Sequence, residues 1–165
     1  MPTLKSLIIA AKFDWVNSDI TEQNFPIETT EPGKCELVDY KKPINTEDVL
    51  DDMEKHNLRP ATLKELLTYA ERKWNGKDAV IAFGSVWQGS GGVRFVPCLD
   101  CGGSGRRLGL DWIDGDWRDG CRFLAVRKSL DTGTLSPSES LEPSGDKIKI
   151  TIECTMEQAR KLLKK

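Results

Sequence analysis

The chain has 165 residues, a formal net charge of -2 and a hydrophobic fraction of 38%. A slightly acidic chain lacks the basic surface that nucleic-acid binding usually needs, so we expect no nucleic-acid partner. The length favours one main domain with a single substantial core. The five cysteines are irregularly spaced and odd in number, which is typical of reduced thiols rather than of a disulfide framework.

The first elements follow from apolar spacing near the N-terminus. Leu4, Leu7, Ile8 and Ala11 recur at helical intervals, which predicts a short amphipathic helix over 3–11. The apolar run at 7–11 is too short for a signal peptide or a membrane span. We therefore expect synthesis in the cytoplasm and no membrane span, whereas the sequence leaves the oligomeric state open.

Residues 13–16 are expected to anchor aromatic side chains on the core, and residues 17–34 lack periodicity and read as loop. Alternation over 35–40 predicts a strand. A second helix is expected over 46–57, because Glu47 and Asp48 lie in its first turn and an apolar side follows.

The third helix carries the strongest local signal. Thr62 and Glu65 have the spacing of a capping box, in which each side chain satisfies a backbone donor at the helix start. Behind them a continuous apolar stripe is formed by Leu63, Leu66, Leu67, Ala70 and Trp74. The segment 58–60 is expected to join this helix to the preceding one.

The remaining segments of the main domain predict strands and one long loop. Strand-forming residues over 79–88 and 93–99, separated by a turn at 89–92, predict a hairpin. Residues 100–120 are Gly-rich and Asp-rich and are expected to be irregular, with short extended pieces near 108–110. The strand 121–127 would close the sheet. Because long structureless loops are uncommon unless they are functional, we interpret this one as functional.

The C-terminal part has a different composition. Residues 129–146 are rich in Ser, Pro and Gly and are expected to be a linker. Alternating isoleucines predict a strand over 147–153, and Thr155 is expected to cap a last helix. The sequence does not tell how this strand and helix pack.

The window 89–127 has an unusual composition. It contains no Lys, Glu, Gln or Met, although these four types fill about one position in five of the whole chain. Its apolar residues form a framework: Val96, Leu99, Leu108, Leu110, Trp112, Trp117, Phe123, Leu124 and Val126. The small and polar residues between them all have codons that end in a pyrimidine. Trp, which has no such codon, occurs only in the framework. This pattern is expected if AAY codons had been randomised at their first two bases.

The window resembles the variable region of target proteins of diversity-generating retroelements, in which an error-prone reverse transcriptase rewrites adenine-containing codons inside a C-type lectin fold. Two motifs add to the resemblance. The segment 58–70 resembles the helix start of formylglycine-generating-enzyme-type lectin folds, with Arg59, Thr62, Glu65 and Tyr69 in place. The segment 122–127 resembles their closing strand.

The resemblance implies an α+β, C-type lectin-like fold over 1–128, with a small, twisted, mainly antiparallel sheet flanked by two helices and a long irregular ligand-binding loop region. The variable region would span about 98–121. The implied scaffold positions are Leu99, Arg106, Leu108, Leu110, Trp112 and Trp117. The implied ligand-binding positions are Asp100, Cys101, Gly102, Gly103, Ser104, Arg107, Gly109, Asp111, Ile113, Asp114, Gly115, Asp116, Arg118, Asp119, Gly120 and Cys121.

The function implied is non-enzymatic binding of a protein or other macromolecular ligand, with no catalytic residue, cofactor or metal. One alternative is a formylglycine-generating-enzyme-like or zinc-binding domain that uses Cys98, Cys101 and Cys121, because the first two have Cys-x-x-Cys spacing. A purely structural assembly protein is another. The aspartates of 111–119 could bind calcium, but their spacing lacks the regularity of an EF-hand. His56 is expected to be a solvated surface residue.

Overall fold

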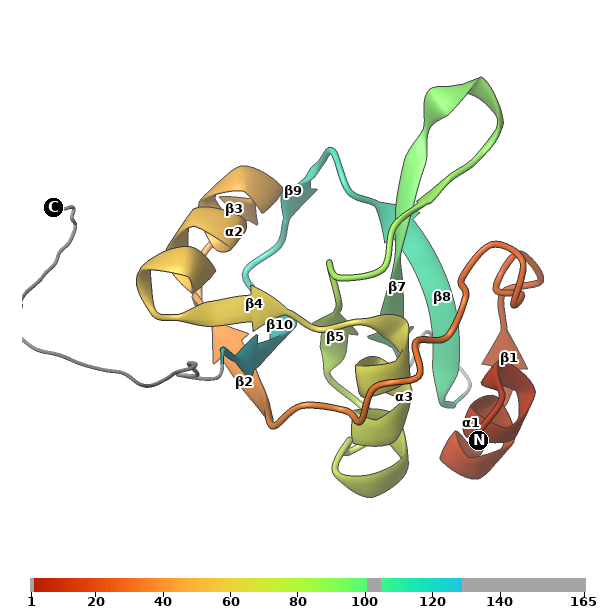
Figure 1. Ribbon diagram of the computed structural model, residues 1–165. Helices are drawn as coiled ribbons and strands as arrows, with labels where there is room; N and C mark the ends of the chain where they lie inside the picture. Colours follow the sequence, from red (N-terminus) through yellow and green to blue (C-terminus); the bar gives the residue numbers. More distant parts are fainter. Residues whose placement is uncertain (1, 101–104, 129–165) are drawn as a thin grey trace, which may run out of the picture. The chain divides into compact units, whose positions relative to one another are not determined.

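The computed structural model describes residues 2–100 and 105–128 (Figure 1). These residues form an α+β unit with three helices and a mostly antiparallel sheet, as the sequence predicts at this coarser level. The predicted linker at 129–146, the strand at 147–153, the helix from Thr155 and the positions 101–104 lie outside the described residues. No helix in the described ranges has both the length and the apolar character needed to cross a membrane.

The helices begin where their caps predict. Helix α1 (Leu4–Ala11) has a capping box of Thr3 and Ser6 and ends at Lys12, which adopts a left-handed conformation with φ of 58°. Helix α2 (Thr46–Lys55) is capped by Asn45. Helix α3 (Leu63–Arg72) has the predicted capping box, and its apolar stripe is buried. The three predicted helices are therefore confirmed.

The sheet runs in the order β1 (Trp15–Val16), β8 (Arg107–Trp112), β7 (Arg94–Asp100), β5 (Ala79–Ile81), β10 (Cys121–Arg127) and β2 (Cys35–Asp39). The short strands β4 (Leu58–Pro60) and β6 (Trp87–Gln88) pair with β10 and β7. A separate ladder joins β3 (Ile44–Asn45) to β9 (Asp116–Trp117). The β1/β8 and β5/β10 pairs are parallel, and the other pairs are antiparallel.

The predicted irregular loop over 100–120 is wrong in its central part. Strand β8 pairs with β7 from Arg107 opposite Asp100 to Trp112 opposite Phe95. The expected hairpin of 79–88 with 93–99 exists, but its first arm is broken into β5 and β6, and a 3₁₀ turn at Ser90–Gly92 connects it to β7. Residues 107–112 form a strand because they pair with β7, and this pairing outweighs the low strand preference of Gly and Asp.

One face of the sheet, here called the helical face, is covered by α1 and α3 (Figure 1). Val80, Leu99, Leu108, Leu124 and Val126 point from four strands into this layer and are almost fully buried. Because successive side chains on a strand point to opposite faces, each of these residues has neighbours on the other face. The resemblance implied two flanking helices, but α1 is a third, since it packs on α3.

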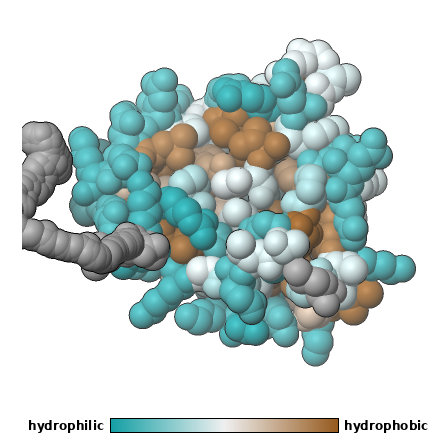
Figure 2. All heavy atoms as spheres, in the orientation of Figure 1, coloured by the Kyte–Doolittle hydropathy of each residue, from teal (hydrophilic) through white to brown (hydrophobic). Residues whose placement is uncertain are grey.

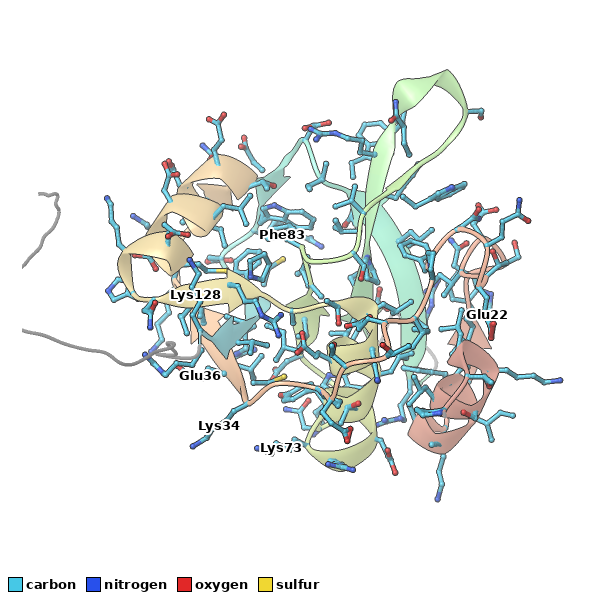
Figure 3. All side chains as sticks on the ribbon, in the orientation of Figure 1. Glu22, Lys34, Glu36, Lys73, Phe83 and Lys128 are labelled. Carbon is cyan, nitrogen blue, oxygen red and sulfur yellow. The ribbon has the colours of Figure 1, made fainter. Side chains whose placement is uncertain are left out.

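The described residues 2–100 and 105–128 cover the opposite face, here called the open face, only in part. Helix α2 and Trp117 pack over Ile81, Val96, Phe123 and Ala125. The Phe83 ring, labelled in Figure 3, is buried between α2 and the sheet, where it stacks on Phe123 with ring centroids 5.4 Å apart. Toward β7 and β8 this cover ends. The view in Figure 2 shows hydrophobic residues in separate patches among hydrophilic ones.

Candidate ligand-binding face

The uncovered part of the open face is built by the alternation of β8. Leu108 and Leu110 point to the helical face, whereas Arg107, Gly109 and Asp111 point to the open face. Leu108 is fully buried, and Asp111 is exposed. Arg107 and Leu110 are half-buried, and Gly109 is buried. One strand therefore presents framework positions to one face and predicted varied positions to the other, and of the varied positions Asp111 is the exposed one.

Strand β7 extends this surface. Cys98 lies opposite Gly109, and Asp100 lies opposite Arg107. Arg107 Nε lies 3.9 Å from the Asp100 carboxylate, and the Arg107 guanidinium lies 4.5 Å from the ring centre of Trp15 on β1. Side chains of three adjacent strands thus meet at one end of the face.

The Cys98 thiol lies at the centre of this group and is buried. Burial, together with the carboxylates of Asp111 and Asp100, raises its pKa to about 12. Burial is also the largest cause that raises the pKa of Cys121. Both thiols are therefore protonated at neutral pH, which is the opposite of the low pKa that reactive cysteines show.

A second group of predicted varied positions lies over the start of α2. Asp114, Gly115 and Asp116 line a hollow of about 520 Å³ together with Thr46, Leu50 and other residues of that helix. Arg94 of β7 forms an ion pair with Asp114 across the hollow. Arg118, Asp119 and Gly120 follow and are exposed, and Cys121 is half-buried at the start of β10.

Two residues differ in exposure from what the sequence predicts. Ile113, predicted to vary at the surface, is 7% exposed and belongs to the core under α2, while Trp112, predicted to be framework, is 62% exposed. The Ile113 backbone is also held, because its N–H donates to the Arg94 carbonyl and its carbonyl accepts from the Thr46 hydroxyl. After Trp112 the chain leaves β8 and crosses toward α2. Ile113 is therefore buried under α2, whereas Trp112, at the end of β8, is exposed.

Four of the predicted scaffold positions pack in the two hydrophobic cores. Leu99 and Leu108 are fully buried, and Leu110 is partly buried against the same cluster. The buried Trp117 ring donates from Nε1 to the Thr46 hydroxyl at 2.8 Å. The ring also contacts Phe83 and Phe123 in the core under α2.

Arg106, also predicted as scaffold, holds the start of β8. Its guanidinium donates to the carbonyls of Ala11 and Ala70, at the C-terminal ends of α1 and α3, with distances of 2.9 and 2.7 Å. It also lies 4.6 Å from the ring centre of Trp74. A cation at two helix C-termini is favourable because the last carbonyls carry partial negative charge.

Among the described residues, no arrangement of side chains favours the metal-binding or the catalytic alternative. Within 2–100 and 105–128, no group of three or more Cys, His, Asp or Glu side chains is arranged to hold a metal ion. Cys35, Cys98 and Cys121 are free thiols, and Cys101 lies outside the described residues. His56 is exposed on α2, as expected.

The sequence did not point to two residues of this surface, Trp15 and Arg94. Trp15 was expected to face the core, but it is 44% exposed and lies beside Gly109. Its neighbours in the fold come from a segment about ninety positions away, so no local pattern could reveal the contact. Arg94 could have been noticed only as a charged residue at the start of a predicted strand.

Comparison with known families, with curated proteins and with solved structures found no match to this chain. The class of protein that can be stated is therefore the α+β unit described above.

Proposed function

We propose that this chain is a non-enzymatic binding protein with a C-type lectin-like fold, and that its diversified residues contact a protein ligand. The observation that carries the proposal is the division of β8. The positions expected to vary, Arg107, Gly109 and Asp111, share the open face, whereas Leu108 and Leu110 pack on the helical face. Variation restricted to one face would change a surface without changing the core.

The remaining varied positions add to the same surface in two places. Asp100 continues it on β7, and 114–116 with 118–121 form the crossing segment that returns to β10. Ile113 is excluded from the proposed surface because its side chain is buried in the core under α2. Gly109 is also buried, but it is kept because a side chain there would contact the partly exposed Trp15. Asp114 is included because it is exposed, although Arg94 pairs with it.

The backbone under this surface is fixed, which suits a site whose side chains change. Strand β8 is paired along its whole length with β7 and, at Arg107 and Leu108, with β1. Arg106 anchors the start of β8, and the buried Trp117 anchors the crossing segment. A preorganised backbone lowers the ordering cost of binding, so affinity can come from side chains that differ between variants.

The fold assignment is supported by the helix start and the closing strand that carry the resemblance. Glu65 is buried, caps α3, and accepts a bidentate pair of hydrogen bonds from Arg59 at 2.9 and 2.7 Å. It also accepts from the Gly33 N–H at 2.7 Å. Strand β10 then pairs with β2, β4 and β5. These contacts explain why Arg59 and Glu65 would be kept while the open face changes.

A display library tests the proposal. Pyrimidine-ending random codons are placed at Asp100, Arg107, Gly109, Asp111, Asp114, Asp116, Arg118 and Asp119, and the full-length variants are selected separately on lysozyme and on streptavidin. A matched control library randomises the exposed α2 positions Asp48, Asp51, Glu54 and Lys55, which do not line the hollow. We expect most members of the first library to melt cooperatively and to yield target-specific binders more often than the control. Aggregation of nearly all members would overturn the proposal.

A further inference from the structure

Trp15 is a large apolar residue on the open face that lies outside the compositionally unusual window. Its side chain is 44% exposed, on the two-residue edge strand β1. The more exposed Trp112 belongs to the window and points to the other side of β8, as the alternation with Arg107, Gly109 and Asp111 requires. Trp15 is thus a constant aromatic residue set beside positions that we propose to vary.

Two varied positions contact the indole directly. The Arg107 guanidinium lies 4.5 Å from its ring centre, a distance at which a cation interacts favourably with an aromatic face. A Cβ atom at Gly109 would lie 3.9 Å from Trp15 Cζ3 and 3.8 Å from Cys98 Sγ, which is ordinary van der Waals contact. A side chain larger than Ala at 109 would therefore extend into the space next to the ring.

The backbone of Trp15 is held on both sides. The N–H groups of Asp14 and Trp15 donate to the Arg106 carbonyl at 2.8 and 3.3 Å, and the Asn17 N–H donates to the Leu108 carbonyl at 2.9 Å. The Asp14 carboxylate accepts from the Arg106 N–H at 2.8 Å. The backbone that carries the indole is therefore already ordered, so a partner that covers the ring need not order this segment.

We propose that Trp15 is a constant anchor of the binding surface, which packs against an apolar side chain of the protein ligand, while positions 107 and 109 set how much of the ring is available. This inference rests on the proposed function. Buried aromatic anchors carry a large share of binding energy at protein interfaces. A fixed anchor beside varied side chains would give every variant a common source of affinity, and the varied residues would supply the specificity.

The binders selected on lysozyme and on streptavidin provide the test. Each of several independent binders is prepared with Trp15→Ala, with Trp15→Phe and, as the matched control on the other side of β8, with Trp112→Ala. Affinity is measured by biolayer interferometry, and folding is checked by thermal melting. We expect Trp15→Ala to weaken binding at least about tenfold for most binders to both targets, Trp15→Phe to restore part of it, and Trp112→Ala to change it less than about twofold.

The outcomes separate the two proposals. If folded binders are obtained and Trp15→Ala leaves their affinities unchanged, or if Trp112→Ala costs as much, the anchor is rejected and the binding function stands. If the library yields folded variants but no binders, both are rejected. If Trp15→Ala fails to fold, the comparison of Trp15→Phe with the parent binder decides, because an affinity unchanged by loss of the indole would also reject the anchor.

Discussion

The helical face and the open face belong to the same strands, but packing restricts the choice of residue much more on the helical face than on the open face. On the helical face, Leu108 and Leu124 are fully buried against α1 and α3, so a change of volume there creates a cavity or a clash. On the uncovered part of the open face, Arg107 and Asp111 border solvent. A sheet can thus hold one side constant and leave the other free to change, because side chains alternate with a period of two.

The largest effect expected from this difference is at Leu108. Leu108→Ala should lower the free energy of unfolding by about 2 to 5 kcal/mol through loss of buried area and formation of a cavity, and Trp117→Ala should fall in a similar range. Arg107→Ala, its neighbour on the open face, should cost less than about 1 kcal/mol. Urea denaturation measures both. Equal losses for Leu108→Ala and Gly109→Ser would show that the two faces are not distinct.

A pH series tests the contacts that hold the helical side. Burial alone would raise the pKa of Glu65, but hydrogen bonds from Arg59, Thr62 and Gly33 outweigh it and hold the pKa below the usual value of a glutamate. A depressed pKa in the folded state stabilises the protein above the unfolded pKa, and this contribution is lost as the pH falls through the folded value. Thermal melts of the parent should therefore lose stability below about pH 4.5.

Glu65→Gln is the matched variant for that series. It should lower the free energy of unfolding at pH 7 by about 2 to 3 kcal/mol, less than for a fully buried pair because the Arg59 side chain is 40% exposed. Its stability should also depend less on pH over the acid range. An unchanged acid response in this variant would mean that other carboxyl groups dominate.

Ile113 sharpens the boundary between constant and varied positions. Ile113→Ala should cost about 2 kcal/mol, because the side chain is buried under α2. Asp111→Ala, two residues earlier on the exposed part, should change stability by less than about 0.5 kcal/mol. Chemical denaturation of the two variants side by side gives the comparison, and a neutral Ile113→Ala would return this position to the varied set.

The smallest effect expected concerns the thiols under the open face. Because burial raises the pKa of Cys98 to about 12, iodoacetamide at pH 8 should modify Cys98 more slowly than the half-buried Cys121, as measured by mass spectrometry of peptides. Elemental analysis should find zinc well below one ion per chain. Stoichiometric zinc that disappears in a Cys98→Ser, Cys101→Ser double variant would favour the zinc-binding alternative instead.

Local patterns predicted the helices well. The caps and the apolar stripe of α3 act within a few residues, so the Thr62 and Glu65 spacing was enough to place its start. The alternation of framework and varied residues over 107–112 was itself a strand signal. Gly and Asp are poor strand formers and favour an irregular segment there, but pairing with β7 outweighs that preference.

By itself, the sequence determined the α+β class and the three helices, because capping and periodicity are local properties. Only the tertiary structure decided that Trp15 meets Arg107, that Ile113 is buried and that Trp112 is exposed. These facts depend on how strands far apart in the chain are paired and on where the chain leaves β8. Side-chain burial at such points is set by the neighbours that topology brings together, and no local pattern contains them.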